Sequence, residues 1–197
     1  MSDELTSTLL QKLATLTQAL DAAGFRHAVG GGIALAFHAN PRFTNDIDIN
    51  IAADPTQIDD LVVALPAEVV VMPRDLEDLR RTSQVRLRWP NPEQDPELGT
   101  PIDVFLPAHP TFHSRLNDRA EPASLGGVTF RVVSATDLTI LKALFDRSKD
   151  WVDIEDMLSH GKVDVEDVLR WLQVLLGDDD SRIGRLQSLA HEVNARS

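Results

Sequence analysis

Three aspartates have the residue type and spacing that metal chemistry needs. Asp46 and Asp48 alternate with isoleucines over residues 46–49, and Asp103 stands alone between apolar residues. On a strand, successive side chains point to opposite faces, so Asp46 and Asp48 would share one face about 7 Å apart. Two carboxylates in that position repel each other unless a cation lies between them. Their hard oxygen atoms suit Mg2+ or Mn2+ better than zinc.

Each of these features also has an ordinary explanation. Asp46 and Asp48 could lie on the wet face of a half-buried strand, and Asp103 could be a lone residue on an edge strand. The three glycines at 30–32 could bring amide N–H groups close to phosphate oxygens, or they could form an ordinary tight turn. A glycine turn, an Asp-x-Asp strand and a later aspartate are more specific together than any one of them alone.

Hydrophobic periodicity predicts the elements that must position these residues. Leucines at three- and four-residue spacings predict an amphipathic helix over 5–23. Alternation of polar and apolar residues predicts strands over 46–52 and 84–89. In full, the predicted strands are 26–29, 46–52, 68–72, 84–89, 102–106 and 128–133, the predicted helices are 5–23, 33–39, 54–65 and 74–81, and residues 90–100 are predicted to form a loop, most simply a hairpin connection.

From Ser134 onward the pattern becomes helical. Ser134 to Asp137 fits a capping box ahead of an apolar run, and helical stretches follow near 150–159, 164–176 and 180–195. The predicted fold class is therefore α+β. We expect a mixed sheet with flanking helices over residues 1–133, and a C-terminal helical region packed on that core over residues 134–197.

Composition excludes several classes of function. The 197 residues carry a formal net charge of −12, which argues against a broad basic surface for nucleic acid and would suit a cationic partner. The chain has no cysteine, so disulfides, thiolate catalysis and cysteine-based zinc sites are excluded. The N-terminal residues are acidic and no apolar run approaches about 18 residues. We expect a cytoplasmic protein without membrane contact.

The motifs resemble the polymerase-β-like nucleotidyltransferase superfamily. Residues 31–38 (Gly-Gly-Ile-Ala-Leu-Ala-Phe-His) and 42–49 (Arg-Phe-Thr-Asn-Asp-Ile-Asp-Ile) are most similar to its AbiE-type (abortive infection) toxin branch and that branch's uncharacterised relatives. A second block, with Asp137, Lys142 and residues 147–154, is similar to the helical motif of that branch. The resemblance covers about residues 5–160 and implies a nucleotidyltransferase-type mixed sheet.

The resemblance also implies a role for each matching residue. Asp46, Asp48 and Asp103 would bind two Mg2+ or Mn2+ ions, and Asp103 would help to deprotonate the acceptor hydroxyl. Lys142 would be the main cation for the triphosphate. The remaining nucleotide-binding positions implied by the motifs are Gly31, Gly32, Arg42, Thr44 and Lys149.

The predicted activity is a metal-dependent transfer of a nucleoside monophosphate from a nucleoside triphosphate to an acceptor hydroxyl. The toxin resemblance suggests an RNA end or a protein side chain as the acceptor, whereas the acidic composition suits a small cationic drug. A third interpretation is a nucleotide-binding or interaction module that has kept the fold without turnover. The sequence leaves open the nucleotide, the acceptor and the existence of an antitoxin partner.

Overall fold

The structure is a computed structural model that describes residues 2–91 and 99–196. The chain forms two compact units, one of residues 1–33 and 43–133 and the other of residues 34–42 and 134–197. The sequence pattern assigns residues 34–42 to the sheet region, but in the structure they group with the C-terminal helices. Each unit is described separately below.

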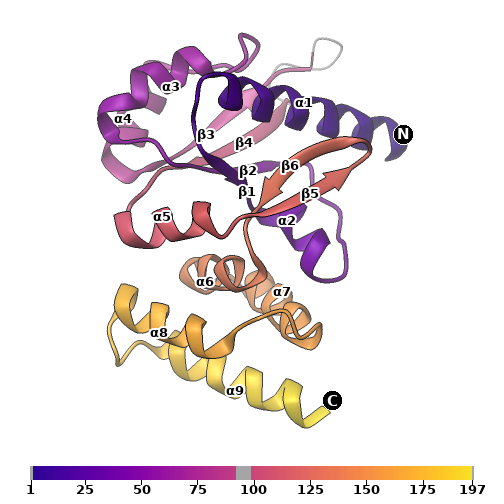
Figure 1. Cartoon of the computed structure of the whole chain (residues 1–197), viewed down its shortest axis with the longest axis vertical. Helices are drawn as coiled ribbons and strands as arrows, with labels where there is room; N and C mark the ends of the chain where they lie inside the picture. Colours follow the sequence, from indigo (N-terminus) through magenta and orange to yellow (C-terminus); the bar gives the residue numbers. More distant parts are fainter. Residues whose placement is uncertain (1, 92–98, 197) are drawn as a thin grey trace. The chain divides into compact units, whose positions relative to one another are not determined.

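A mixed sheet forms the centre of the first unit (Figure 1). Within the described residues it has six strands in the order β3-β4-β2-β1-β6-β5. The strands are β1 (His27–Val29), β2 (Ile47–Ile51), β3 (Gln84–Trp89), β4 (Thr100–Phe105), β5 (Glu121–Leu125) and β6 (Val128–Val132). The pairs β2–β4 and β1–β6 are parallel, and the other neighbours are antiparallel. The predicted α+β class with a mixed sheet is confirmed.

Helices of the first unit pack against this sheet. They are α1 (Ser2–Ala22), the 3-10 turn η1 (Pro55–Gln57), α3 (Ile58–Ala64), α4 (Pro73–Thr82) and α5 (Pro110–Asp118). Along α1, Leu13, Leu16 and Leu20 recur on one face and are fully buried, as the predicted periodicity requires. Asp54 caps η1 by accepting a hydrogen bond from the backbone N–H of Thr56.

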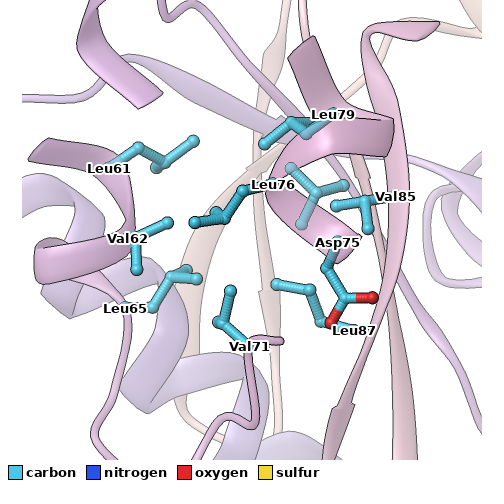
Figure 2. Close-up of a pocket in the computed structure, with 10 residues that line it drawn as sticks. Leu61, Val62, Leu65, Val71, Asp75, Leu76, Leu79, Val85 and Leu87 are labelled. Atoms are coloured by element: carbon cyan, nitrogen blue, oxygen red, sulfur yellow. The ribbon is translucent and has the colours of Figure 1, made fainter. Parts of the chain in front are cut away.

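An apolar layer packs against one face of β3 (Figure 2). Side chains from the α3 and α4 region meet Val85 and Leu87 there and leave a cavity of about 10 Å³, lined by Leu61, Val62, Leu65, Val71, Asp75, Leu76, Leu79, Val85, Leu87 and Val104. That volume is about the size of one water molecule, so this is core packing and not a ligand site. Because side chains alternate along a strand, Arg86 and Arg88 must face the opposite side of the sheet.

The second unit is helical. Its elements are the part of α2 (Gly31–His38) from Ala34 onward, α6 (Ala135–Phe145), α7 (Ser148–Ser159), α8 (Val165–Leu176) and α9 (Ser181–Arg196). Helix α6 packs on α7 and α8, and α9 packs on the same two helices. The predicted cap is present, because the Ser134 hydroxyl accepts a hydrogen bond from the N–H of Asp137. None of the described helices is both long and apolar enough to cross a membrane.

The structure differs from the predicted elements in one strand that is missing and in two elements that are not predicted. Residues 68–72 are not a strand: Val70 makes only one isolated bridge, to Arg88, because Pro73 starts α4 immediately afterwards. Helix α5 and strand β5 are not predicted by the sequence pattern, since α5 is short and only Ala123 is buried along β5. Most of the predicted 90–100 loop, residues 92–98, lies outside the described residues.

Lys12 ties α1 to the ends of β3 and β4. Its side chain is buried, and its ammonium donates hydrogen bonds to the Trp89 carbonyl (3.1 Å), the Thr100 hydroxyl (2.9 Å) and the Asn91 side-chain oxygen. None of these partners is charged, and burial lowers the pKa of Lys12. The interaction joins the helix to the two strands that carry Arg86 and Asp103.

We predict that Lys12→Met destabilises the protein by about 1–3 kcal/mol, because it leaves buried acceptors without a donor. Urea denaturation followed by circular dichroism measures the change. Gln11→Met is the matched control, since Gln11 is the exposed neighbour in the same helix and should change stability by less than about 0.5 kcal/mol. Equal stability of the two variants would show that Lys12 does not hold these strands.

Candidate active site

Strand pairing places Asp48, Asp103 and Arg86 in one row. In the parallel pair β2–β4, Asp48 lies opposite Asp103, and in the antiparallel pair β3–β4, Asp103 lies opposite Arg86. Residues paired across strands project from the same face, so the three side chains are neighbours. This face is opposite the apolar layer that contains Val85 and Leu87.

Asp46 precedes β2 and is oriented by Thr44. The Thr44 hydroxyl donates a hydrogen bond to the Asp46 carboxylate, and both side chains are half-buried. The sequence motif predicts nucleotide binding for Thr44, whereas the contact seen in the structure is with this carboxylate. The hydroxyl reduces the freedom of Asp46 without neutralising its charge.

The two glycines that open α2 make room for the side chains of Asp48 and Thr44. A Cβ atom on Gly31 would lie 1.8 Å from Oδ2, 2.3 Å from Cγ and 2.9 Å from Cβ of Asp48. A Cβ atom on Gly32 would lie 2.8 Å from Cβ and 2.9 Å from the hydroxyl oxygen of Thr44. Gly31 also has φ +54°, a conformation that L-residues other than glycine rarely adopt. The glycine pair therefore admits Asp48 and Thr44, and its predicted contact with the triphosphate stays a prediction.

Arg86 is paired with one of these aspartates, Asp103. Its Nε donates to Oδ1 of Asp103 at 2.7 Å and its Nη2 donates to Oδ2 at 2.6 Å. The hydrogen bonds to Asp103 raise the pKa of Arg86, burial opposes this, and the charges of Asp103, Asp46 and Asp48 raise the pKa further. One guanidinium therefore lies in the field of three carboxylates.

Asp48 and Asp103 share a face and Asp46 lies just before β2, but the three carboxylates turn toward different neighbours. Asp46 is bonded to Thr44, Asp48 lies over Gly31, and Asp103 is paired with Arg86. Across residues 2–91 and 99–196, no three acidic or histidine side chains converge closely enough to hold a metal ion as they stand. Nevertheless, the side chains of Asp46, Asp48 and Asp103 suit a hard divalent cation. Their ligand atoms are carboxylate oxygens, and the three negative charges exceed the single positive charge of Arg86. Convergence on one ion requires at least that the contact between Asp103 and Arg86 be broken.

Lys142 belongs to a buried ionic cluster in the second unit. Its ammonium lies 2.6 Å from Oδ2 of Asp153 and 3.6 Å from Oδ1 of Asp150, and all three side chains are buried. Arg147 also pairs with Asp150, at 2.6 Å. These contacts give Lys142 a structural role in joining α6 to α7. Its predicted role as the main cation for a triphosphate stays a prediction.

Arg42 and Lys149 are the other predicted phosphate-binding cations. Arg42 forms two hydrogen bonds to Asp153, at 3.1 and 3.0 Å, and thereby ties the segment after α2 to α7. Lys149 lies exposed in the first turn of α7. Arg86 is absent from the residues that the motifs single out, although its alternation with Leu87 on a predicted strand could have indicated an exposed cation on the face of the aspartates.

A family model for nucleotidyltransferases of unknown function (DUF6036) matches residues 7–186. The chain belongs to this family. Its membership supports the predicted superfamily and nucleotidyltransferase activity, whereas the narrower AbiE-type assignment stays a prediction. No curated protein sequence matches the chain.

Solved structures support the fold of this nucleotidyltransferase. An antigenic nucleotidyltransferase-like protein from Paracoccidioides brasiliensis is 19% identical over 93% of each chain, with a TM-score of 0.54. The antibiotic-resistance factor ANT(2'')-Ia is 13% identical over 96% of this chain and 93% of its own, with a TM-score of 0.48. JHP933 from Helicobacter pylori is 15% identical over 96% of this chain and 91% of its own, with a TM-score of 0.47. The last two similarities are too low to support an inference.

We predict that Gly31→Ala destabilises the protein by at least about 2 kcal/mol, because the new Cβ adds a clash with Asp48 to the strain of a positive φ. The matched control is Gly24→Ala, since Gly24 has φ +77° with nothing within 4 Å of its added Cβ. Gly24→Ala should therefore show only the backbone strain, about 1–2 kcal/mol. Urea denaturation compares the two, and equal losses would contradict the close approach of Asp48.

We predict that Asp153→Asn destabilises the protein by about 3–5 kcal/mol at pH 7, because it leaves the buried Lys142 without its closest counter-charge. Burial alone would raise the pKa of Asp153, but hydrogen bonds from Arg42 and Lys142 outweigh it and hold the pKa below its ordinary value. A lowered pKa stabilises the fold above the unfolded-state pKa, and this contribution is lost as pH falls through the folded-state pKa.

Urea denaturation from pH 7 down to pH 3 tests this pH dependence. The stability difference between the wild type and Asp153→Asn should shrink as pH falls below about 4. Asp179→Asn serves as the control, because Asp179 is exposed. A difference that is constant with pH would show that the charge of Asp153 does not stabilise the cluster.

Proposed function

We propose that this nucleotidyltransferase uses Mg2+ or Mn2+, held by Asp46, Asp48 and Asp103, to transfer a nucleoside monophosphate to an acceptor hydroxyl. One observation carries the proposal: the parallel pairing of β2 with β4 sets Asp48 directly opposite Asp103. Asp46 lies two residues before Asp48, just ahead of β2. Asp48 and Asp103 thus face one side of the sheet from adjacent strands, and Asp46 lies just before the first of these strands.

Charge balance supports a divalent cation among these residues. Asp46, Asp48 and Asp103 carry three formal negative charges, and Arg86 contributes one positive charge. When bound, the metal ions would activate the attacking oxygen and neutralise charge on the triphosphate and the leaving pyrophosphate. A nucleoside triphosphate is itself strongly anionic, so it could not approach this acidic face without cations.

The protein's own side chains have separate tasks in this proposal. Thr44 orients Asp46, and Gly31 lets the Asp48 carboxylate lie against the start of α2. The acceptor oxygen would form a bond to the α-phosphorus while the bond from that phosphorus to the bridging oxygen breaks and pyrophosphate leaves. The acceptor proton would pass to Asp103, which lies at the edge of the acidic group nearest Arg86.

The net charge of the chain favours one class of acceptor over another. A formal charge of −12 disfavours a long nucleic-acid interface and favours a small cationic acceptor with a hydroxyl group. An RNA end or a protein side chain, as in a toxin with an antitoxin partner, requires only a local site and is the second acceptor class. Both classes use the same transfer chemistry, so labelled products distinguish them.

We predict that α-32P-labelled ATP, GTP, CTP or UTP with Mg2+ or Mn2+ labels one acceptor among aminoglycosides, total RNA and cell protein. Asp48→Asn and Asp103→Asn should each lower the rate by about 100-fold or more, because each removes a metal-binding charge. Scintillation counting of separated products measures the rate, and thermal melting confirms that the variants fold.

Asp60→Asn is the control, since Asp60 is exposed on α3 of the same unit. It should keep the wild-type rate. Wild-type rates in Asp48→Asn would refute the metal site. Nucleotide binding without transfer to any acceptor would favour a binding module that has kept the fold.

A further inference from the structure

Arg86 engages both oxygens of Asp103. The two hydrogen bonds, of 2.7 and 2.6 Å, form the fork-shaped pairing that arginine makes with carboxylates. The Asp103 side chain is only 16% exposed, whereas the Arg86 side chain is 62% exposed. The carboxylate is therefore fixed on β4, and the guanidinium is the partner that can move.

This pairing conflicts with metal binding at Asp103. A divalent cation and a guanidinium on the same small carboxylate would repel each other at short range. In the structure both Asp103 oxygens are already in use, and the three aspartates do not converge on one point. Metal binding through Asp103 must therefore weaken or break its contact with Arg86.

The position of Arg86 indicates where its guanidinium could go. Strand β3 is at the edge of the sheet, and Arg86 projects from it on the face that carries Asp48 and Asp103. Two of its five N–H groups bond Asp103, and the remainder of the exposed guanidinium can meet an anion that arrives on this face. A planar guanidinium also matches the oxygens of a phosphate group.

We propose that Arg86 gates the metal site, holding Asp103 in the nucleotide-free protein and passing to the triphosphate when a nucleotide binds. The inference rests on the proposed function, since it takes Asp103 as a metal ligand. Arg86 then has two alternative anionic partners, Asp103 and the triphosphate. When the triphosphate binds Arg86, Asp103 is released. Metal and nucleotide binding are consequently coupled, each strengthening the other by the same factor.

Mn2+ binding measured by electron paramagnetic resonance tests the gate without an activity assay. Wild type, Arg86→Gln and Asp103→Asn are titrated with Mn2+, alone and with the α,β-methylene analogues of ATP, GTP, CTP and UTP in turn. Wild type should bind Mn2+ weakly alone and about 10-fold more tightly with the preferred analogue, within the usual range of such couplings. Arg86→Gln should bind Mn2+ about 10-fold more tightly than wild type without nucleotide, and the analogue should add little.

Arg88→Gln is the matched control. Arg88 is exposed on the same strand and the same face as Arg86, but it lies opposite Pro101 and not an aspartate. It should reproduce the wild-type affinity and coupling. If Arg88→Gln tightened Mn2+ binding as much as Arg86→Gln, the tighter binding would result from the loss of any positive charge on this face. The gate would then be overturned.

The remaining outcomes separate the two proposals. Mn2+ binding that Asp103→Asn weakens but Arg86→Gln leaves unchanged would overturn the gate and leave the metal site standing. Absence of Mn2+ binding in every protein, with and without each analogue, would overturn the proposed function and the gate with it. The gate predicts that, of the variants tested, only Arg86→Gln binds Mn2+ more tightly than wild type, and that the nucleotide analogue no longer tightens Mn2+ binding in this variant.

Discussion

The parallel pairing of β2 with β4 is the constraint on which the candidate site depends. It fixes the register in which Asp48 meets Asp103, and the antiparallel pairing of β3 then brings Arg86 beside Asp103. A shift of one residue in either pair would send the carboxylate or the guanidinium to the opposite face, into the apolar layer. Burial of Ile47, Ile49, Ile102 and Val104 prevents such a shift, since these apolar residues alternate with the polar ones. Packing of the core thus fixes the strand register that positions Asp48, Asp103 and Arg86.

The strands of this site are predictable from the sequence because their alternation is strong. Residue type and spacing alone single out Asp46, Asp48 and Asp103, and the pattern correctly places Asp48 and Asp103 on strands. The pairing partner of a strand cannot be read from its own periodicity, so the pattern does not indicate that Asp48 lies opposite Asp103, and only the family resemblance implies that they lie close together. The contact of Arg86 with Asp103 is unpredictable for the same reason. It depends on a long-range antiparallel register, not on spacing along the chain.

Lys142 illustrates another limit of motif reasoning. A lysine on a helix followed by acidic residues fits a phosphate-binding cation or an internal ion pair equally well. The structure shows a buried ammonium held by Asp153 and Asp150, with Arg42 sharing Asp153. Such a cluster costs desolvation energy, and it persists only when each charge has a partner. These aspartates therefore hold Lys142 and Arg42 in place within the second unit.

The scarcity of cations explains why exchange of partners is a natural mechanism for this chain. It has 19 lysines and arginines against 31 aspartates and glutamates, and Arg42, Arg86 and Lys142 are each paired with a carboxylate. A triphosphate that approaches the acidic face must bring metal ions with it or take a cation from an aspartate. Among these three, Arg86 has the most exposed side chain, at 62%. Its release therefore requires the least disturbance of the core, and in the proposed gate the carboxylate that it leaves would become a ligand for the metal that the nucleotide brings.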